Sequence, residues 1–160
     1  MRASRVKEFL DTNHIYYSTI VHPTSYTAQG TAAYAHVSGN EMAKTVMVKL
    51  DTQLAMAVLP ASCQLDLAAM KRLSGAKSVC LAAETDFEMR FPDCDLGAMP
   101  PFGNLYGVPV YVEERLAEDK EISFNAGTHN ELARMKYEDF ERVVNPIVGR
   151  FALRPIRTMA

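Results

Sequence analysis

The residue whose type and context most favour chemistry is Lys44, in the run Ala43-Lys44-Thr45-Val46-Met47-Val48-Lys49-Leu50. The run is β-branched in its middle, which is typical of a strand. Alternation along a strand places Lys44 on one face with Val46 and Val48, and Lys49 on the other. A lysine at the mouth of a buried strand is costly unless a polar or anionic group meets it. The run therefore predicts a cation that contacts a ligand, or a lysine whose amine reaches water above its aliphatic stem.

Two glycine-containing segments are the next candidates. Residues 97–107, Gly-Ala-Met-Pro-Pro-Phe-Gly-Asn-Leu-Tyr-Gly, hold three glycines and two prolines, which is typical of a loop. Prolines fix its path, and glycines allow another group to approach its backbone. Its apolar composition fits a binding-site wall or a structural turn packed on the core. Residues 125–130, Asn-Ala-Gly-Thr-His-Asn, predict a second polar turn, in which His129 is a proton carrier, a ligand donor or a surface residue.

Several other kinds of site lack their signatures. No two histidines have metal-ligand spacing, and the chain contains no H-E-x-x-H motif, P-loop, nucleophile elbow or dinucleotide-binding glycine motif. We therefore expect no metal and no cofactor. Cys63 and Cys80 are interpreted as core residues, and Cys94 lies between carboxylates that disfavour a thiolate, so it is not expected to be a nucleophile.

A hydroxyl-rich turn completes the candidates. Ser25, Tyr26 and Thr27 could serve a ligand, and Thr27 could instead cap a helix. One lysine, two glycine-containing loops and these hydroxyls, with no strong base and no metal, suit a site that polarises and positions a carbonyl for water.

The elements that would position these residues alternate between helix and strand. Predicted helices lie at about 4–13, 28–36, 62–74, 84–90 and 137–144, the first capped by Ser4 and the third closed by Gly75. Predicted strands lie at 15–21, 43–50, 54–59, 78–82, 108–112, 122–124 and 131–135, with 78–82 buried and 43–59 forming a central hairpin. This order predicts a mixed α/β fold.

Length and charge narrow the class. The 160 residues fit one domain, residues 1–160, and no apolar stretch is long enough to span a bilayer. No signal-peptide pattern opens the chain, so the expected location is cytoplasmic. The formal net charge of −2 provides no global attraction for nucleic acid, and DNA is not an expected partner. Arginines after Glu141 form a local RNA-binding patch or a solvated tail.

Four segments together, in this order, resemble the YbaK/prolyl-tRNA synthetase-associated editing domain family. They are His22-Pro23-Thr24-Ser25-Tyr26-Thr27, the Lys44 run as far as Lys49, Gly97-Ala98-Met99-Pro100-Pro101-Phe102-Gly103, and Phe124-Asn125-Ala126-Gly127-Thr128-His129. The resemblance extends from the first helix to about Val144 and includes no synthetase catalytic or anticodon-binding region. It is therefore a resemblance to a free-standing member of the family.

The resemblance implies a curved, barrel-like mixed sheet surrounded by helices, and hydrolysis of the ester bond of mischarged aminoacyl-tRNA. Lys44 matches the family's key lysine and is the expected catalytic residue. The expected substrate-binding residues are Thr27, Met47, Gly97, Ala98, Met99, Pro100, Pro101, Phe102, Gly127, Thr128 and His129. Residues 125–129 replace the Gly-Gly-Lys type of turn found in some relatives, so the role of His129 stays open.

Three hypotheses follow for function. In the first, the protein is a trans-editing deacylase that acts on the acceptor end of aminoacyl-tRNA, beside a synthetase, and excludes larger amino acids with Met47, Met99 and Phe102. In the second, it is a non-catalytic module that binds an aminoacyl or nucleotide group. The third is a Schiff-base lysine enzyme with pyridoxal phosphate, which the lack of a phosphate-binding glycine loop before a helix disfavours.

Overall fold

A long antiparallel hairpin forms the centre of the fold. The computed structural model describes residues 5–24, 30 and 41–154, in which β2 (Ala43–Leu50) pairs with β3 (Gln53–Pro60) along its whole length. Asp51 turns the chain with a φ of 57°, in the left-handed region that Asp tolerates well. Its Oδ1 accepts hydrogen bonds from the backbone N–H groups of Lys77 and Ser78, at 3.1 and 3.0 Å. The predicted central hairpin is confirmed.

The hairpin belongs to a five-stranded mixed sheet of order β5-β2-β3-β6-β9. β2 is antiparallel to both of its neighbours, whereas β6 is parallel to β3 and to β9. The strands not yet bounded are β5 (Val79–Leu81), β6 (Val110–Glu113) and β9 (Ile147–Gly149).

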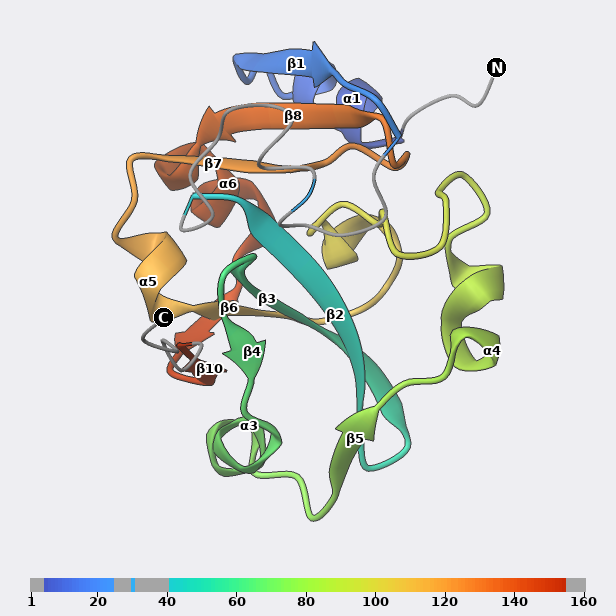
Figure 1. The fold of residues 1–160 in the computed structure, drawn as a ribbon, viewed down its shortest axis with the longest axis vertical. Helices are drawn as coiled ribbons and strands as arrows, with labels where there is room; N and C mark the ends of the chain where they lie inside the picture. The colour runs from blue at the N-terminus through green and yellow to red at the C-terminus, as the bar shows by residue number, and fades with distance from the viewer. Residues whose placement is uncertain (1–4, 25–29, 31–40, 155–160) are drawn as a thin grey trace, which may run out of the picture.

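Two smaller sheets complete the strands. An antiparallel sheet of order β1-β8-β7 lies above the five-stranded sheet in Figure 1, and β4 pairs with β10 in a separate two-stranded sheet. Their strands are β1 (Tyr17–Val21), β8 (Glu131–Lys136), β7 (Glu121–Asn125), β4 (Gln64–Leu65) and β10 (Ala152–Leu153). The mixed α/β class is confirmed, although these described strands form separate sheets and not a closed barrel.

The helices cover both sides of the hairpin. They are α1 (Arg5–Thr12), α3 (Leu67–Ser74), α4 (Glu84–Phe87), α5 (Glu114–Ala117) and α6 (Tyr137–Val144), with short 3-10 turns η1 (Glu88–Arg90) and η2 (Gly103–Leu105). The main core joins one face of the hairpin to α1, α6 and the sheet of β1, β8 and β7. A second core joins the other face to α3 and Phe151. Alternation along β2 and β3 therefore divides the apolar residues between two cores.

One buried carboxylate ties the C-terminal part of the described chain to the sheet. Glu113 ends β6 and is 2% exposed. Its Oε2 accepts the N–H of Arg115 at 2.7 Å, and its Oε1 accepts those of Phe151 and Ala152 at 3.1 and 3.2 Å. Three donated hydrogen bonds satisfy a charge that would otherwise be costly to bury.

Some elements of the structure differ from the predicted ones. The third predicted helix begins only at Leu67, because Asp66 caps it by accepting the N–H of Ala69, and Leu65 belongs to β4 instead. The predicted strand at 78–82 is not buried: β5 lies at a sheet edge, and Cys80 is exposed and not a core residue. The predicted helix at 28–36 and both proposed caps, Ser4 and Thr27, lie outside the described residues. Within the described ranges, no helix has the length and hydropathy of a membrane span.

We expect Glu113→Ala to lower the free energy of unfolding by about 3 kcal/mol, because three buried N–H groups lose their acceptor. The matched control is Glu114→Ala, which removes a surface ion pair with the exposed Arg150, and such pairs contribute little. Urea unfolding of both variants measures the difference. Equal stability losses in the two variants would contradict the structural role of Glu113.

Candidate active site

Two glycine-containing segments far apart in sequence meet at one place. The N–H of Gly127 donates to the carbonyl oxygen of Ala98 at 3.1 Å, and the N–H of Asp95 donates to that of Gly127 at 2.7 Å. Gly97 and Gly127 have φ values of +84° and +103°, which favour glycine. These hydrogen bonds join the 97–102 loop to the 125–130 turn, so backbone conformations that require glycine lie on both sides of the junction.

His129 completes this junction. Its side chain is largely buried, and its Nε2 lies 2.7 Å from the carbonyl oxygen of Leu96. Since a carbonyl only accepts, Nε2 carries the proton. A Cβ on Gly97 would lie 3.4 Å from Cε1 of His129, in van der Waals contact with the ring. The imidazole is thus oriented by the same loop that it faces.

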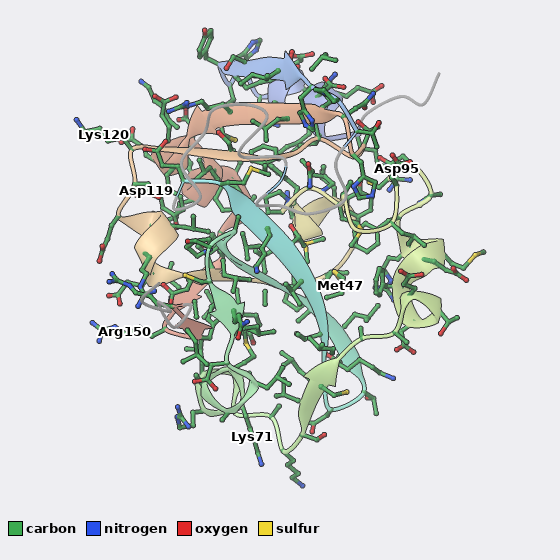
Figure 2. The ribbon with its side chains drawn as sticks, in the orientation of Figure 1. Met47, Lys71, Asp95, Asp119, Lys120 and Arg150 are labelled. Carbon is green, nitrogen blue, oxygen red and sulfur yellow. The ribbon has the colours of Figure 1, made fainter. Side chains whose placement is uncertain are left out.

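A surface hollow of about 620 Å³ opens beside the junction. Asp95, labelled in Figure 2, lies on this side of the molecule. The lining contains hydroxyl, amide, carboxylate and imidazole groups, from Thr24, Cys94, Asp95, Leu96, Thr128, His129 and Asn130. Thr128 donates to the side chain of Asn130 at 2.8 Å. Such a polar, open hollow can hold a ligand with several hydrogen-bonding groups.

The thiol in this lining is not a nucleophile. Burial raises the pKa of Cys94 to about 11, and the Asp93 carboxylate acts in the same direction, although a contact with the Tyr106 hydroxyl opposes them. The thiol therefore stays protonated at neutral pH, as the flanking carboxylates predicted.

Lys44 lies near the start of β2, close to β7, the strand that leads into the 125–130 turn. Met42 forms a parallel bridge with Ser123, which places the start of β2 against β7 (Figure 1). Two residues further along each strand are Lys44 and Asn125. Met42, on the same face of β2 as Lys44, packs against Leu132, the pairing partner of Asn125. The start of β2, which carries Lys44, therefore lies near the base of the 125–130 turn.

The environment of Lys44 is partly desolvated. The side chain is half-buried, and burial lowers the pKa of its amine, an effect that the nearby Cys63 opposes. Lys49 differs, because it lies at the end of β2 and pairs with Asp86 at 3.5 Å. The two lysines of one strand thus have different surroundings.

The structure separates some residues that the sequence had grouped. Gly97, Ala98, Gly127 and His129 come together, but Met47, Met99 and Phe102 are buried in the main core. The prolines of the loop are also buried: Pro100 and Pro101. The described lining of the hollow does not include Lys44. Thr27 lies outside the described residues.

Two polar residues beside Lys44 were missed by the sequence reasoning. Ser123 is fully buried, and its Oγ has no hydrogen-bond partner within the described part of the chain; the same holds for Oδ1 of Asn125. Both alternate along β7 with Ile122 and Phe124, which face the main core. That polar and apolar alternation was the signal that could have found them.

We expect Gly97→Ala to disturb His129, because the new methyl group would touch its ring at a φ that strains alanine. Gly75→Ala is the matched control, since Gly75 has a φ of +74° and nothing within 4 Å of the added Cβ. Both variants should lose about 1–2 kcal/mol of stability from the backbone alone. Only Gly97→Ala should shift the imidazole NMR signals of His129. Unchanged signals would show that the loop does not orient the ring.

We expect Lys44→Met to stabilise the fold at pH 7. The pKa of Lys44 is lower in the folded than in the unfolded chain, so at neutral pH the folded state bears the cost of a partly buried charge. As pH rises through the pKa of Lys44 in the folded state, the folded wild type loses the proton before the unfolded chain does. The stability difference between wild type and Lys44→Met therefore shrinks. The melting temperatures of both proteins between pH 7 and 10 measure this convergence. A constant difference would indicate that desolvation of the amine is not the cause.

Comparisons with known proteins bear on the fold and the family. The solved structure of the hypothetical protein APE2540 has a TM-score of 0.82 at 21% identity, covering 92% of this chain and 98% of that chain. A candidate trans-editing enzyme for prolyl tRNA synthetase has a TM-score of 0.79 at 20% identity, covering 92% and 94%. At these identities the likeness establishes the fold. Curated protein sequences give no significant match. The sequence model of the aminoacyl-tRNA editing domain matches residues 22–143, and the chain therefore belongs to the aminoacyl-tRNA editing domain family.

Proposed function

We propose that this protein is a trans-editing hydrolase that deacylates mischarged aminoacyl-tRNA carrying a small amino acid. The observation that carries the proposal is the hydrogen-bonded junction of the 97–102 loop with the 125–130 turn, in a chain of the editing-domain family. Family membership supplies the substrate class, the acceptor end of an aminoacyl-tRNA. The junction supplies a rigid backbone surface against which an aminoacyl group can be held.

In the proposed reaction, a water molecule attacks the carbonyl carbon of the aminoacyl ester. The bond between that carbon and the ribose oxygen breaks, and a proton passes to the ribose oxygen. Lys44 and the backbone N–H groups of Gly97 and Met99 in the 97–102 loop stabilise the negative charge that develops on the carbonyl oxygen. Because Lys44 is half-buried, its charge acts through a medium of lower dielectric constant than water. A hydroxyl of the tRNA helps to move the proton.

The proposed substrate-binding groups divide into two kinds. Gly97, Ala98, Gly127, Thr128 and His129 contact the aminoacyl end, and Thr27 contributes from the hydroxyl-rich segment. The buried members of the loop act from behind: Met99 and Phe102 fix its backbone by packing in the main core with Met47, and Pro100 and Pro101 fix its path. A loop held in this way excludes larger side chains. One methylene group provides only about 1–3 kcal/mol of discrimination, which explains the use of a separate editing step.

A synthetase is the proposed companion of this reaction. A structural neighbour is described as a candidate trans-editing enzyme for prolyl tRNA synthetase. By analogy, this chain would remove the errors of a synthetase that lacks sufficient editing of its own.

We expect Lys44→Ala to lower kcat/KM for deacylation by about 10²–10³-fold, the usual effect of removing a group that stabilises an oxyanion. Lys49→Ala is the matched control from the same strand and should stay within about twofold, because Lys49 pairs with Asp86 and such exposed pairs contribute little. A panel of mischarged tRNAs, assayed for release of the amino acid, measures both. Tight tRNA binding by wild type, with negligible turnover by wild type and Lys44→Ala alike, would contradict the enzyme and indicate a non-catalytic binding module.

A further inference from the structure

A second hollow, of about 690 Å³, lies away from the loop junction. It is formed by the segment between α5 and β7, the end of β8, and α6, with Tyr16 at its edge. Figure 2 labels Asp119 and Lys120 on this side of the molecule and Asp95 on the opposite side. Its volume is in the range of small-molecule sites. The proposed editing reaction makes no use of it.

Two buried oxygen atoms in this lining have no hydrogen-bond partner within the described residues. They are Oδ2 of Asp119 and the hydroxyl of Tyr137. The Tyr137 side chain is only 4% exposed. Burial, and secondarily the charge of Glu141, raises the pKa of Tyr137 to about 12, so the phenol keeps its proton. Tyr137 and Glu141 both line the hollow. Unsatisfied buried polar atoms are rare and point to a missing partner.

The charges around Asp119 favour a cationic partner. Burial, followed by Glu41 and Glu118, raises the pKa of Asp119 to about 6, so its carboxylate is still charged at neutral pH. Arg134 is one of two cations on β8, and Glu121 and Glu41 already hold its guanidinium group at 3.1 and 3.2 Å.

The other cations of the lining do not neutralise the negative charge around Asp119. The Lys120 side chain extends outward from the fold (Figure 2), and Lys136 is exposed at the end of β8. Glu121, Glu138 and Glu141 add three more carboxylates to the lining. Within the described ranges, no three His, Cys, Asp or Glu side chains are grouped as metal ligands.

We propose that this hollow binds a primary aliphatic amine, whose ammonium group donates hydrogen bonds to Oδ2 of Asp119 and to the Tyr137 hydroxyl oxygen. The ammonium ion supplies three donors on a compact charge, which matches one carboxylate oxygen and one phenolic oxygen. The aliphatic part lies along Ala117, toward the exposed ring of Tyr16. The acid-rich rim accommodates a second ammonium group of a diamine.

The test is calorimetric and NMR titration of the full chain with putrescine and n-butylamine at low salt, with 1-butanol as the uncharged analogue. We expect both amines to bind and 1-butanol to bind at least tenfold more weakly, since a charge-assisted hydrogen bond contributes about 1.5–3 kcal/mol. The amide signals that shift should belong to residues 117–121 and 134–141. Titration with Nα-acetyl-lysine methylamide distinguishes a free amine from a lysine side chain of another protein.

Two variants and one control localise the binding. Asp119→Asn should weaken putrescine binding about tenfold or more, and Tyr137→Phe should weaken it about threefold to tenfold. Glu118→Gln removes a neighbouring negative charge outside the lining and should stay within about threefold. Absence of amine binding at 10 mM, equal binding of 1-butanol, or equal losses in Asp119→Asn and Glu118→Gln would overturn the proposal. Deacylation of tRNA, assayed in parallel, should be unchanged in Asp119→Asn.

Discussion

The pairing of β2 with β3 over eight residues decides which side chains of this protein enter a core and which can meet a ligand. Every second residue of β2 faces the main core, and the residues between them, including Lys44, face the opposite side. A shift of one residue in this register would turn Lys44 toward the main core and Met47 toward the second core. The pairing is continuous from Ala43 to Leu50, so the register is specified by a complete strand and not by one contact.

The polar groups near Lys44 show how the fold departs from simple burial of apolar side chains. Ser123 and Asn125 bring polar atoms into a protected setting at the point where β7 approaches the start of β2. Such groups do not add to the core, and an unsatisfied one reduces stability. Ordered, partly desolvated groups need little rearrangement when a substrate arrives.

Sequence patterns predicted much of the fold, because the strongest signals were local. The hairpin, the α6 helix and the β7–β8 pair each show their own periodicity or turn residues, and all three are present. The strands β9 and β10 were missed, since they are short and depend on distant partners such as Glu113. Composition predicted the two glycine-containing loops, whereas their meeting followed only from the resemblance to the editing-domain family; hydrogen bonds join them. Burial of Phe102 was not predicted, because a loop sequence does not reveal which of its side chains turns inward.

The hydrogen bonds accepted by Glu113 also affect how the chain folds during synthesis. The carboxylate is made 38 residues before its partner Phe151, a delay of about 2–8 s at typical rates of translation. During that interval β6 can pair with β3, but its other edge has no partner until β9 is made. The Glu113 carboxylate at the end of β6 also lacks the N–H donors that later satisfy it. The central sheet is therefore completed last at its β9 edge, and until then β6 presents an unpaired edge that could pair with a wrong strand.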